Sequence, residues 1–259
     1  MPRLSKLSRS VEGKVVIVTG AASGMGRATA HLFADEGASV AVTDLREEDV
    51  ERVVGEIREA GGKAHGWRLD VADAEAIVRV VGEIAERFGG IDVLVNNAGI
   101  VVGTTVDAPD YEAHWDRALA VMLTAHVRMV RACLPHLRQA EAGRIVNIAS
   151  TEGLGAQPLT SPYTAAKHGV VGLTRSLAVE LGSTRITVNC VCPGPIRTGM
   201  TAPIPDEAKA KFARRRVPLG RYGDPEEVAH ATLSLALPAS SYINGVALPV
   251  DGGMTIKTG

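Results

Sequence analysis

A tyrosine and a lysine in the segment SPYTAAKHG are spaced so that their side chains can act together on a proton. Residues 161–182 have a helical pattern, and Tyr163 and Lys167 are four positions apart, so both project from one face of the predicted helix. A phenol with its ordinary pKa of about 10 is a poor base at neutral pH, and lowering that pKa by about 3 units requires about 4 kcal/mol. An ammonium about 4 Å away supplies roughly that free energy at an effective dielectric of about 20. The pair therefore indicates a tyrosine that exchanges protons near neutral pH.

A serine is placed to join this pair. Ser150 ends the strand-like run RIVNIAS at residues 144–150, thirteen residues before Tyr163. The end of that strand and the start of the next helix can meet at one edge of a parallel sheet, so Ser150, Tyr163 and Lys167 can converge there. Taken singly, the three residues have ordinary structural explanations as a strand terminus, a half-buried ring and a surface lysine.

The glycine-rich stretch TGAASGMG, residues 19–26, predicts a nucleotide site at the same edge. It follows the apolar run VVIV and opens a helical pattern. Gly20 permits a sharp turn, and Gly24 and Gly26 leave room for a diphosphate and for helix–sheet packing. The helix N-terminus adds unpaired N–H groups and a positive partial charge. Alone, such a stretch is a weak signal, because a tight strand–helix turn is the alternative interpretation.

An aspartate at the end of the second predicted strand favours one dinucleotide over the other. Asp44 follows the glycines by about 20 residues, where a carboxylate accepts hydrogen bonds from the adenosine ribose. Its charge would repel a 2′-phosphate, and Ser23 in the turn offers no positive charge to offset it. Arg46 is the one feature that favours NADP. We therefore expect NAD.

Short runs rich in valine and isoleucine alternate with segments of helical period. Strands are predicted at residues 15–19, 39–44, 63–71, 91–99, 144–150, 186–194 and 245–253. Helices are predicted at residues 24–37, 47–62, 112–139, 161–182 and 224–237, with one more from the acidic residues after Val71 to Phe88. Such alternation requires crossover connections. It predicts an α/β fold, a single-domain doubly wound Rossmann fold with a parallel sheet of about seven strands, over residues 1–259 with a flexible tail at 1–10.

Composition excludes several other classes of protein. The formal net charge is −1, so no nucleic-acid surface is expected, and Arg214–Arg216 are interpreted as a solvated helix face. Three cysteines, Cys133, Cys190 and Cys192, suit a reducing cytosol better than a disulfide framework. The N-terminal MPRLSKLSRS lacks the apolar run of a secretory signal, and no apolar stretch approaches the roughly 18 residues of a membrane span. The histidines show no metal-ligand spacing. We expect a cytoplasmic protein without a metal or membrane.

Together with NNAG at residues 96–99 and PGPIRT at 193–198, these motifs occur in the order and spacing of the short-chain dehydrogenase/reductase family. Residues 11–253 resemble its compact form of about 250 residues. The resemblance implies an NAD-dependent oxidoreductase that interconverts a secondary alcohol and a ketone by hydride transfer. In that role Tyr163 exchanges the substrate proton, Ser150 bonds the substrate oxygen, and Lys167 also holds the nicotinamide ribose.

The resemblance also implies a set of cofactor-binding residues. Asp70 and Val71 would contact the adenine, residues 97–99 the ribose side, and Ile196 and Thr198 the carboxamide. The full predicted set is Gly20, Ser23, Gly24, Met25, Gly26, Asp44, Leu45, Asp70, Val71, Asn97, Ala98, Gly99, Tyr163, Lys167, Pro193, Gly194, Ile196 and Thr198. A homotetramer is likewise implied, built on the helices at 112–139 and 161–182 and on the C-terminal strand.

One position departs from the family. In WDRALAVMLTAHV, Met122 stands where the family has an asparagine whose backbone carbonyl helps hold a water leading from the lysine to solvent. Methionine keeps the carbonyl but loses the side-chain amide. We expect an altered proton relay rather than an absent one.

The predicted substrate pocket is mostly apolar. The resemblance makes residues 199–217 a substrate-covering lid, and the expected substrate contacts are Ser150, Glu152, Leu154, Tyr163 and Met200. These favour a hydrophobic secondary alcohol or ketone, cyclic ones included. Glu152 would either meet a polar substrate group or face solvent.

Two alternatives stay open. A 3-oxoacyl-thioester reductase would commonly use NADP and a basic docking surface, and Asp44 argues against it. A non-catalytic dinucleotide-binding module would need no intact Ser–Tyr–Lys set, and only Met122 favours it.

Overall fold

The computed structural model describes residues 4–258, so residues 1–3 of the predicted tail, and Gly259, lie outside the described part. The last residues of the predicted tail at 1–10 contact the domain. The carbonyl of Ser8 accepts a hydrogen bond from the Ala239 amide at 2.8 Å, and Val11 is buried.

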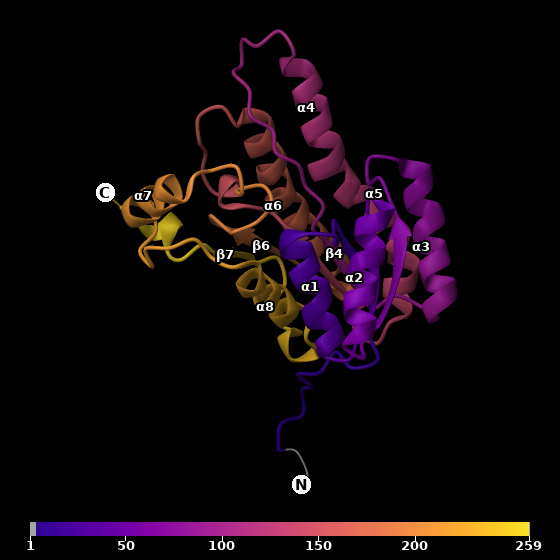
Figure 1. Cartoon of the computed structure of the whole chain (residues 1–259). Coiled ribbons are helices and arrows are strands. Elements are labelled where there is room, and N and C mark those ends of the chain that lie inside the picture. The colour runs from indigo at the N-terminus through magenta and orange to yellow at the C-terminus, as the bar shows by residue number, and fades with distance from the viewer. Residues whose placement is uncertain (1–3, 259) are drawn as a thin grey trace.

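Within residues 4–258, seven parallel strands form one sheet at the centre of the molecule, in the order β3-β2-β1-β4-β5-β6-β7 (Figure 1). They are β1 (Val15–Thr19), β2 (Ser39–Asp44), β3 (Lys63–Arg68), β4 (Val93–Asn96), β5 (Arg144–Ile148), β6 (Thr187–Pro193) and β7 (Ala247–Val250). Every residue of β1, β4, β5 and β6 is buried, as expected for strands covered on both faces. The predicted doubly wound α/β fold is confirmed.

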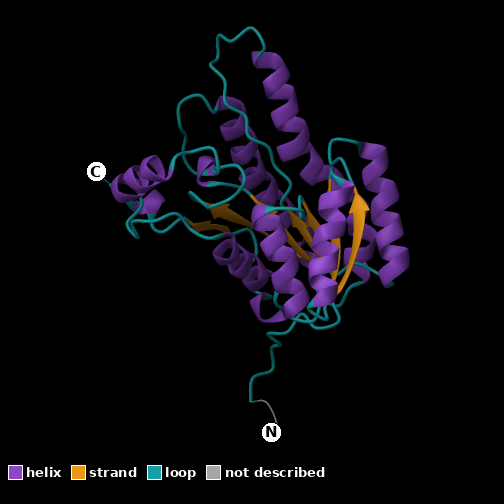
Figure 2. Cartoon of the chain, viewed as in Figure 1, coloured by secondary structure: helices purple, strands orange, loops and turns teal. Residues whose placement is uncertain are grey.

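Helices cover both faces of the sheet (Figure 2). One face carries α1 (Gly24–Asp35), α2 (Glu47–Glu59) and α8 (Pro225–Ala236), and the other carries α3 (Ala74–Phe88), α4 (Tyr111–Leu119), α5 (Ala125–Gln139) and α6 (Ser161–Leu181). Alternate residues of β1 show the division: Ile17 packs into one core layer and Val18 into the other. Short 3₁₀ turns lie at Thr151–Gly153, Gly182–Thr184, Pro238–Ser240 and Met254–Ile256.

The helix predicted at 112–139 is interrupted. A π-helical turn, Ala120–Thr124, joins α4 to α5 and contains Met122. A π-turn inserts one residue into the helical repeat without breaking the helix, so the apolar pattern on either side still reads as helical. By length and composition, the whole helix Tyr111–Gln139 is the one segment within residues 4–258 that could cross a membrane. Its residues Met129 and Leu137 are buried in the core beside the sheet.

A further helix lies within the predicted lid. α7 (Asp206–Arg216) begins with two acidic residues and ends with three arginines, an arrangement that complements the helix dipole. It lies beside the C-terminal end of the chain, on the side of the molecule away from α3 (Figure 1). The arginines do lie on an exposed helix face, as the sequence indicated.

The strand order reverses between β1 and β4, because β2 and β3 extend the sheet one way and β5–β7 extend it the other. In such sheets ligands bind outside the carboxyl ends of the strands at this switch point. The glycine turn, Asp44, Asn97 and Ser150 follow β1, β2, β4 and β5 respectively, so the topology gathers them at one edge.

Candidate active site

The glycine-rich turn between β1 and α1 is shaped by contacts that only glycine permits. Gly20 has φ +63°, and a Cβ added there would lie 2.8 Å from Ala98 Cα. A Cβ at Gly26 would overlap the Gly20 carbonyl oxygen. Asn97 fixes the turn by donating from Nδ2 to the carbonyls of Thr19 and Gly20, at 2.8 and 3.0 Å. The backbone where the first helix begins therefore carries no bulky side chain and is held in place by hydrogen bonds.

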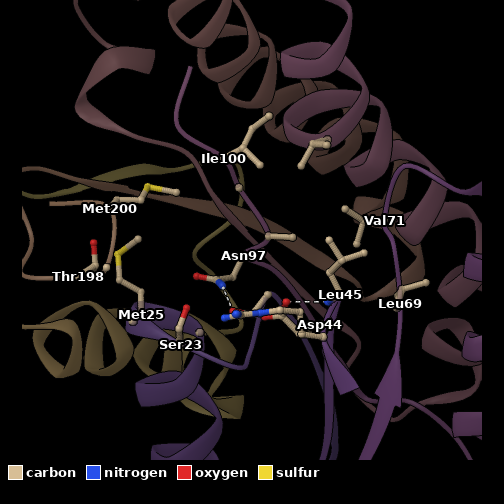
Figure 3. Close-up of a pocket in the computed structure, with 18 of the residues that line it drawn as sticks. Ser23, Met25, Asp44, Leu45, Leu69, Val71, Asn97, Ile100, Thr198 and Met200 are labelled. Carbon is tan, nitrogen blue, oxygen red and sulfur yellow. Dashed lines mark hydrogen bonds between the residues drawn. The ribbon is translucent and has the colours of Figure 1, made fainter. Parts of the chain in front are cut away.

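A pocket of about 400 Å³ follows the carboxyl ends of β1, β2 and β4 (Figure 3). Asp44 and Val71 lie at one end of it, and Thr198 and Met200 at the other, so the pocket is elongated. Its shape, the bare turn and the N-terminus of α1 fit an extended dinucleotide. The predicted cofactor residues that line it are Gly20, Ser23, Gly24, Met25, Gly26, Asp44, Leu45, Asp70, Val71, Asn97, Ala98, Gly99 and Thr198.

Other predicted cofactor residues lie outside this pocket. Gly194 packs against Asp251, where an added Cβ would come within 2.7 Å of the aspartate Cβ. Ile196 is buried and lines a separate cavity beside Gly223, and Pro193 ends β6. Of the PGPIRT segment, only Thr198 reaches the pocket. Tyr163 and Lys167 do not line it either, so cofactor contact by Pro193, Gly194, Ile196, Tyr163 and Lys167 stays a prediction.

Several lining residues were missed from the sequence. They are Arg46, Leu69, Ile100, Arg117, Val121 and Gly199. Arg117 and Val121 are four positions apart on the helix that carries Met122, and this spacing was the available signal. The others lie next to predicted residues on the same loops.

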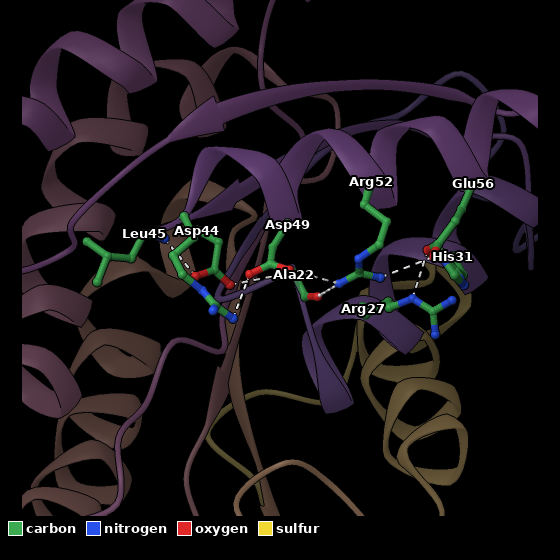
Figure 4. Close-up of polar contacts among 9 residues, drawn as sticks. Ala22, Arg27, His31, Asp44, Leu45, Asp49, Arg52 and Glu56 are labelled. Atoms are coloured by element: carbon green, nitrogen blue, oxygen red, sulfur yellow. Dashed lines mark hydrogen bonds and ion pairs between the residues drawn. The ribbon is translucent and has the colours of Figure 1, made fainter.

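Asp44 is held rigidly by backbone amides at one end of the pocket (Figure 4). Its Oδ2 accepts from the Ala22 amide at 3.0 Å and its Oδ1 from the Leu45 amide at 2.6 Å. Arg46, the residue that could favour NADP, pairs instead with Asp49 at 2.6 Å. The carboxylate is thus fixed toward the pocket, while the neighbouring guanidinium is engaged by another acid.

Two further cations beside the glycine turn, Arg27 and Arg52, are also paired (Figure 4). Arg52 donates to the Ala22 carbonyl at 2.9 Å and to Glu56 at 3.1 Å, which ties α2 to the glycine turn. Glu56 also accepts from Arg27 at 2.8 Å and contacts His31 at 3.0 Å. These partners, Arg27 first, hold the pKa of Glu56 at about 2. The cluster fixes the loop without leaving Arg27 or Arg52 free for a phosphate.

Ser150, Tyr163 and Lys167 meet at the carboxyl end of β5. Lys167 is buried, and its Nζ donates to the Ile148 carbonyl at 2.7 Å. The same Nζ lies 5.7 Å from the centroid of the half-buried Tyr163 ring. Ser150 Oγ accepts from the Glu152 amide at 3.1 Å, so its hydroxyl hydrogen remains available to another acceptor. The three groups predicted to carry the chemistry are together.

The protonation of this cluster differs from the sequence-based argument. Burial raises the pKa of Tyr163, and the Glu152 charge adds to this, while the Ser150 hydroxyl lowers it in part. Burial lowers the pKa of Lys167 to about 8, so the side chain remains an ammonium at neutral pH. The expected lowering of the tyrosine pKa was wrong, because burial of the phenol outweighs its neighbours. A tyrosine that keeps its proton is suited to donating it.

Met122 and His126, a histidine missed from the sequence, are both buried, and His126 lies near enough to Lys167 to be affected by its charge. Met122 is fully buried in the π-turn, and His126, one turn further on, is 2% exposed with no hydrogen-bond partner for Nε2 among the described residues. Burial, then the Lys167 charge, lowers the pKa of His126 to about 3, so the ring is neutral. A neutral imidazole with an unpartnered ring nitrogen is therefore buried four positions beyond Met122 on the same continuous helix. Its spacing of four residues from Met122 was the sequence signal that could have identified it.

The predicted substrate contacts separate into two places. Glu152 does not face solvent: it is buried, and its Oε2 accepts from Thr164 at 2.8 Å, Thr160 at 3.3 Å and the Gln157 amide at 3.0 Å. It therefore ties the loop after Ser150 to the first turn of α6. Met200 lines the dinucleotide pocket, whereas Leu154 lines a second cavity of about 720 Å³ between that loop and α7.

Comparisons with known proteins agree with this arrangement. Residues 20–255 match a family model described as enoyl-(acyl carrier protein) reductase. The chain is 41% identical to 3-oxoacyl-[acyl-carrier-protein] reductase of Thermotoga maritima over 95% of this chain and 99% of that one. It is 42% identical to cis-4-hydroxycyclohexanecarboxylate dehydrogenase of Sinomonas cyclohexanicum over 93% of this chain and 96% of that one.

A solved structure agrees as well. The crystal structure of a dehydrogenase/reductase from Sinorhizobium meliloti superposes with a TM-score of 0.89, at 39% identity, over 95% of this chain and 97% of that one. Fold, motif order and these similarities lead to one conclusion: the chain belongs to the short-chain dehydrogenase/reductase family of oxidoreductases, which bind a nicotinamide dinucleotide.

Proposed function

We propose that the protein is an NAD-dependent dehydrogenase/reductase that interconverts a secondary alcohol and a ketone. The observation that carries the proposal is the convergence of Ser150, Tyr163 and Lys167 at the sheet edge that also holds the glycine turn and Asp44. When bound, the nicotinamide supplies or accepts the hydride.

The chain's own residues would handle the proton. Ser150 donates to the substrate oxygen, and Tyr163 gives its proton to that oxygen during ketone reduction or removes one during alcohol oxidation. The buried Lys167 ammonium stabilises the phenolate that remains after donation. Because the pKa of Tyr163 is raised, the reductive direction starts from the form that is populated at neutral pH.

Charge in the dinucleotide pocket supports NAD over NADP. Asp44 is fixed toward the ribose end by two backbone amides, and Arg46 is paired with Asp49. Arg117 also lines the pocket, but it lies on α4, one turn before Val121, and not on the loop that carries Asp44. A 2′-phosphate next to Asp44 would meet a carboxylate with no unpaired guanidinium on its own loop.

A 3-oxoacyl-thioester reductase is the second candidate, favoured by the similarity to the Thermotoga maritima enzyme. The purified protein would be given a panel of linear and cyclic secondary alcohols with NAD or NADP, and 3-oxoacyl thioesters with NADH or NADPH. We expect NAD-dependent alcohol oxidation that Tyr163→Phe abolishes. Faster turnover of the thioesters with NADPH would favour the second candidate. Tight NADH binding without turnover of any substrate would instead indicate a non-catalytic module.

We also propose a cytosolic homotetramer. The three cysteines are unpaired, which suits a reducing compartment. The surfaces of α5 and α6 expose apolar side chains, with Val127 37% and Val179 86% accessible. Such residues suit the helix faces through which the family resemblance implies assembly. Light scattering on the eluting protein would test the tetramer, and a monomeric mass would exclude it.

A further inference from the structure

The wall of the second cavity begins at the residues that directly follow Ser150 in the chain. Its volume is about 720 Å³, and it is bounded by the loop after Ser150, by α7 and by the C-terminal turn Met254–Ile256. Figure 1 shows α7 next to the C-terminal end of the chain. Thr151 and Glu152, on its wall, directly follow Ser150, and Glu152 is bonded to Thr164, the neighbour of Tyr163. A substrate held at the catalytic hydroxyls can therefore extend into it.

Four cationic side chains line this cavity. They are Lys211, Arg215, Arg216 and Lys257. Within residues 4–258, none of the four has a carboxylate within ion-pair distance. The single carboxylate on the wall, Glu152, already accepts three hydrogen bonds through one oxygen. In a chain whose net charge is −1, this local excess of positive charge does not follow from composition.

The positive wall is held in place by the segment around it. Asp251 accepts from the Thr255 amide at 2.7 Å, the Thr255 hydroxyl at 2.8 Å and the Gly253 amide at 2.9 Å, which fixes the C-terminal turn. Lys257 Nζ then donates to the Arg215 carbonyl at 2.7 Å and joins that turn to the end of α7. The cations are thus presented by two segments that are tied together.

The cavity also has apolar walls. Leu154, Phe212 and Met254 line it together with the cations. The predicted lid runs from one site to the other, because Gly199 and Met200 line the dinucleotide pocket while α7 lines this cavity. One ligand could place an apolar body between the two sites and a charged end against α7.

We propose that this cavity binds an anionic group, a carboxylate or a phosphate, that the substrate carries away from its reacting carbon. The inference rests on the proposed function, since it identifies the substrate class of the same site. Cations in the cavity attract such a group over several ångströms. The planar guanidinium groups of Arg215 and Arg216 can each donate two parallel hydrogen bonds to a carboxylate or a phosphate. The substrate is then an apolar, mid-sized hydroxy or oxo acid, or an oxoacyl thioester whose carrier bears the phosphate.

The test compares charged and neutral substrates of the same shape. Reduction of a cyclic oxocarboxylate and of its methyl ester would be measured with NADH in the wild type, in Lys211→Met and in Arg215→Met. We expect kcat/KM to be at least tenfold higher for the acid, and each variant to reduce that preference about fivefold or more through KM. Arg214→Met removes a charge from the same helical turn outside the cavity lining and should leave the preference unchanged.

A thioester arm identifies the source of the anion. A 3-oxoacyl-coenzyme A and the same acyl group on uncharged N-acetylcysteamine would be compared in the same variants. A charge-dependent preference here, and none between acid and ester, would assign the cavity to phosphate. Equal turnover of charged and neutral partners in both arms would overturn the inference and leave the proposed function intact.

A binding measurement covers the case without turnover. Calorimetric titration of the NADH complex with the oxocarboxylate should show binding that weakens in Arg215→Met and not in Arg214→Met. If nothing turns over but this pattern holds, the proposed function fails and the anion site stands. If binding is the same in both variants, the anion site fails.

Discussion

Replacing Asp44 by asparagine should relax the preference for NAD over NADP. The side chain lies at the ribose end of the dinucleotide pocket, and two backbone amides hold both of its oxygens (Figure 4). Asparagine keeps the size and one acceptor oxygen but removes the charge. The variant therefore tests whether fixed negative charge, rather than shape, excludes a 2′-phosphate.

The magnitude follows from Coulomb's law. A phosphate carrying about two charges, about 5 Å from the carboxylate at an effective dielectric of about 40, is repelled by about 3 kcal/mol. That free energy corresponds to a factor of roughly 200 in the ratio of kcat/KM for the two cofactors. The lost acceptor at Ala22 or Leu45 should cost about 1 kcal/mol of stability and lower the Tm by about 2–4 °C.

The assay measures kcat/KM for NAD and NADP with one alcohol substrate at constant ionic strength. We expect Asp44→Asn to reduce the NAD preference about 100-fold or more, mainly by lowering the KM for NADP. Glu48→Gln, which removes an exposed charge from the nearby first turn of α2, should change the ratio less than about threefold. An unchanged ratio in Asp44→Asn, or an equal change in Glu48→Gln, would refute the reasoning.

Three further changes test other parts of the structure. Tyr163→Phe should lower kcat by about 10²–10⁴-fold while the Kd for NADH, measured by fluorescence, stays within about threefold; normal turnover would remove the proton-transfer role. Met122→Asn should change kcat by no more than about tenfold, or about 1.4 kcal/mol, because the peptide carbonyl is retained and His126 supplies a polar atom; a much larger gain would mean that the native relay is broken. Glu56 has a pKa of about 2 in the fold against 4.5 as its ordinary value, so its contribution is complete above about pH 4.5 and is lost as the pH falls through 2. Glu56→Gln should therefore lower the unfolding free energy at pH 7 by about 1 kcal/mol and flatten its decline between these pH values, and urea titrations showing the same slope as the wild type would contradict this.

The sheet was predictable because most of the strands are apolar and each connecting helix has its own period and stop. The glycine turn and Asp44 were predictable for the same reason, since chain order alone places them at the carboxyl edge. The π-turn at Met122 was not, because one inserted residue leaves the helical pattern on both sides intact.

The cationic cavity depends on contacts distant in sequence. α7 meets the C-terminal turn through Lys257 and the Arg215 carbonyl, 42 residues apart, and no local pattern encodes that distance. The raised pKa of Tyr163 likewise reflects burial, which the spacing to Lys167 could not reveal. Glu152 points inward because it accepts hydrogen bonds from Thr160, which directly precedes α6, and from Thr164 within α6. Only the fold brings these residues together.

The buried thiols can report local unfolding of the elements that carry them. Cys133 in α5 and Cys190 and Cys192 in β6 are buried and form no disulfide, and they belong to different core clusters. Burial also raises the pKa of Cys133, so its thiol stays protonated and unreactive while the helix is closed. An alkylating reagent can therefore reach each cysteine only when its element opens, and the labelling rate measures that opening. A dinucleotide that binds the closed sheet edge should slow the labelling of β6 in proportion to its stabilisation of the fold.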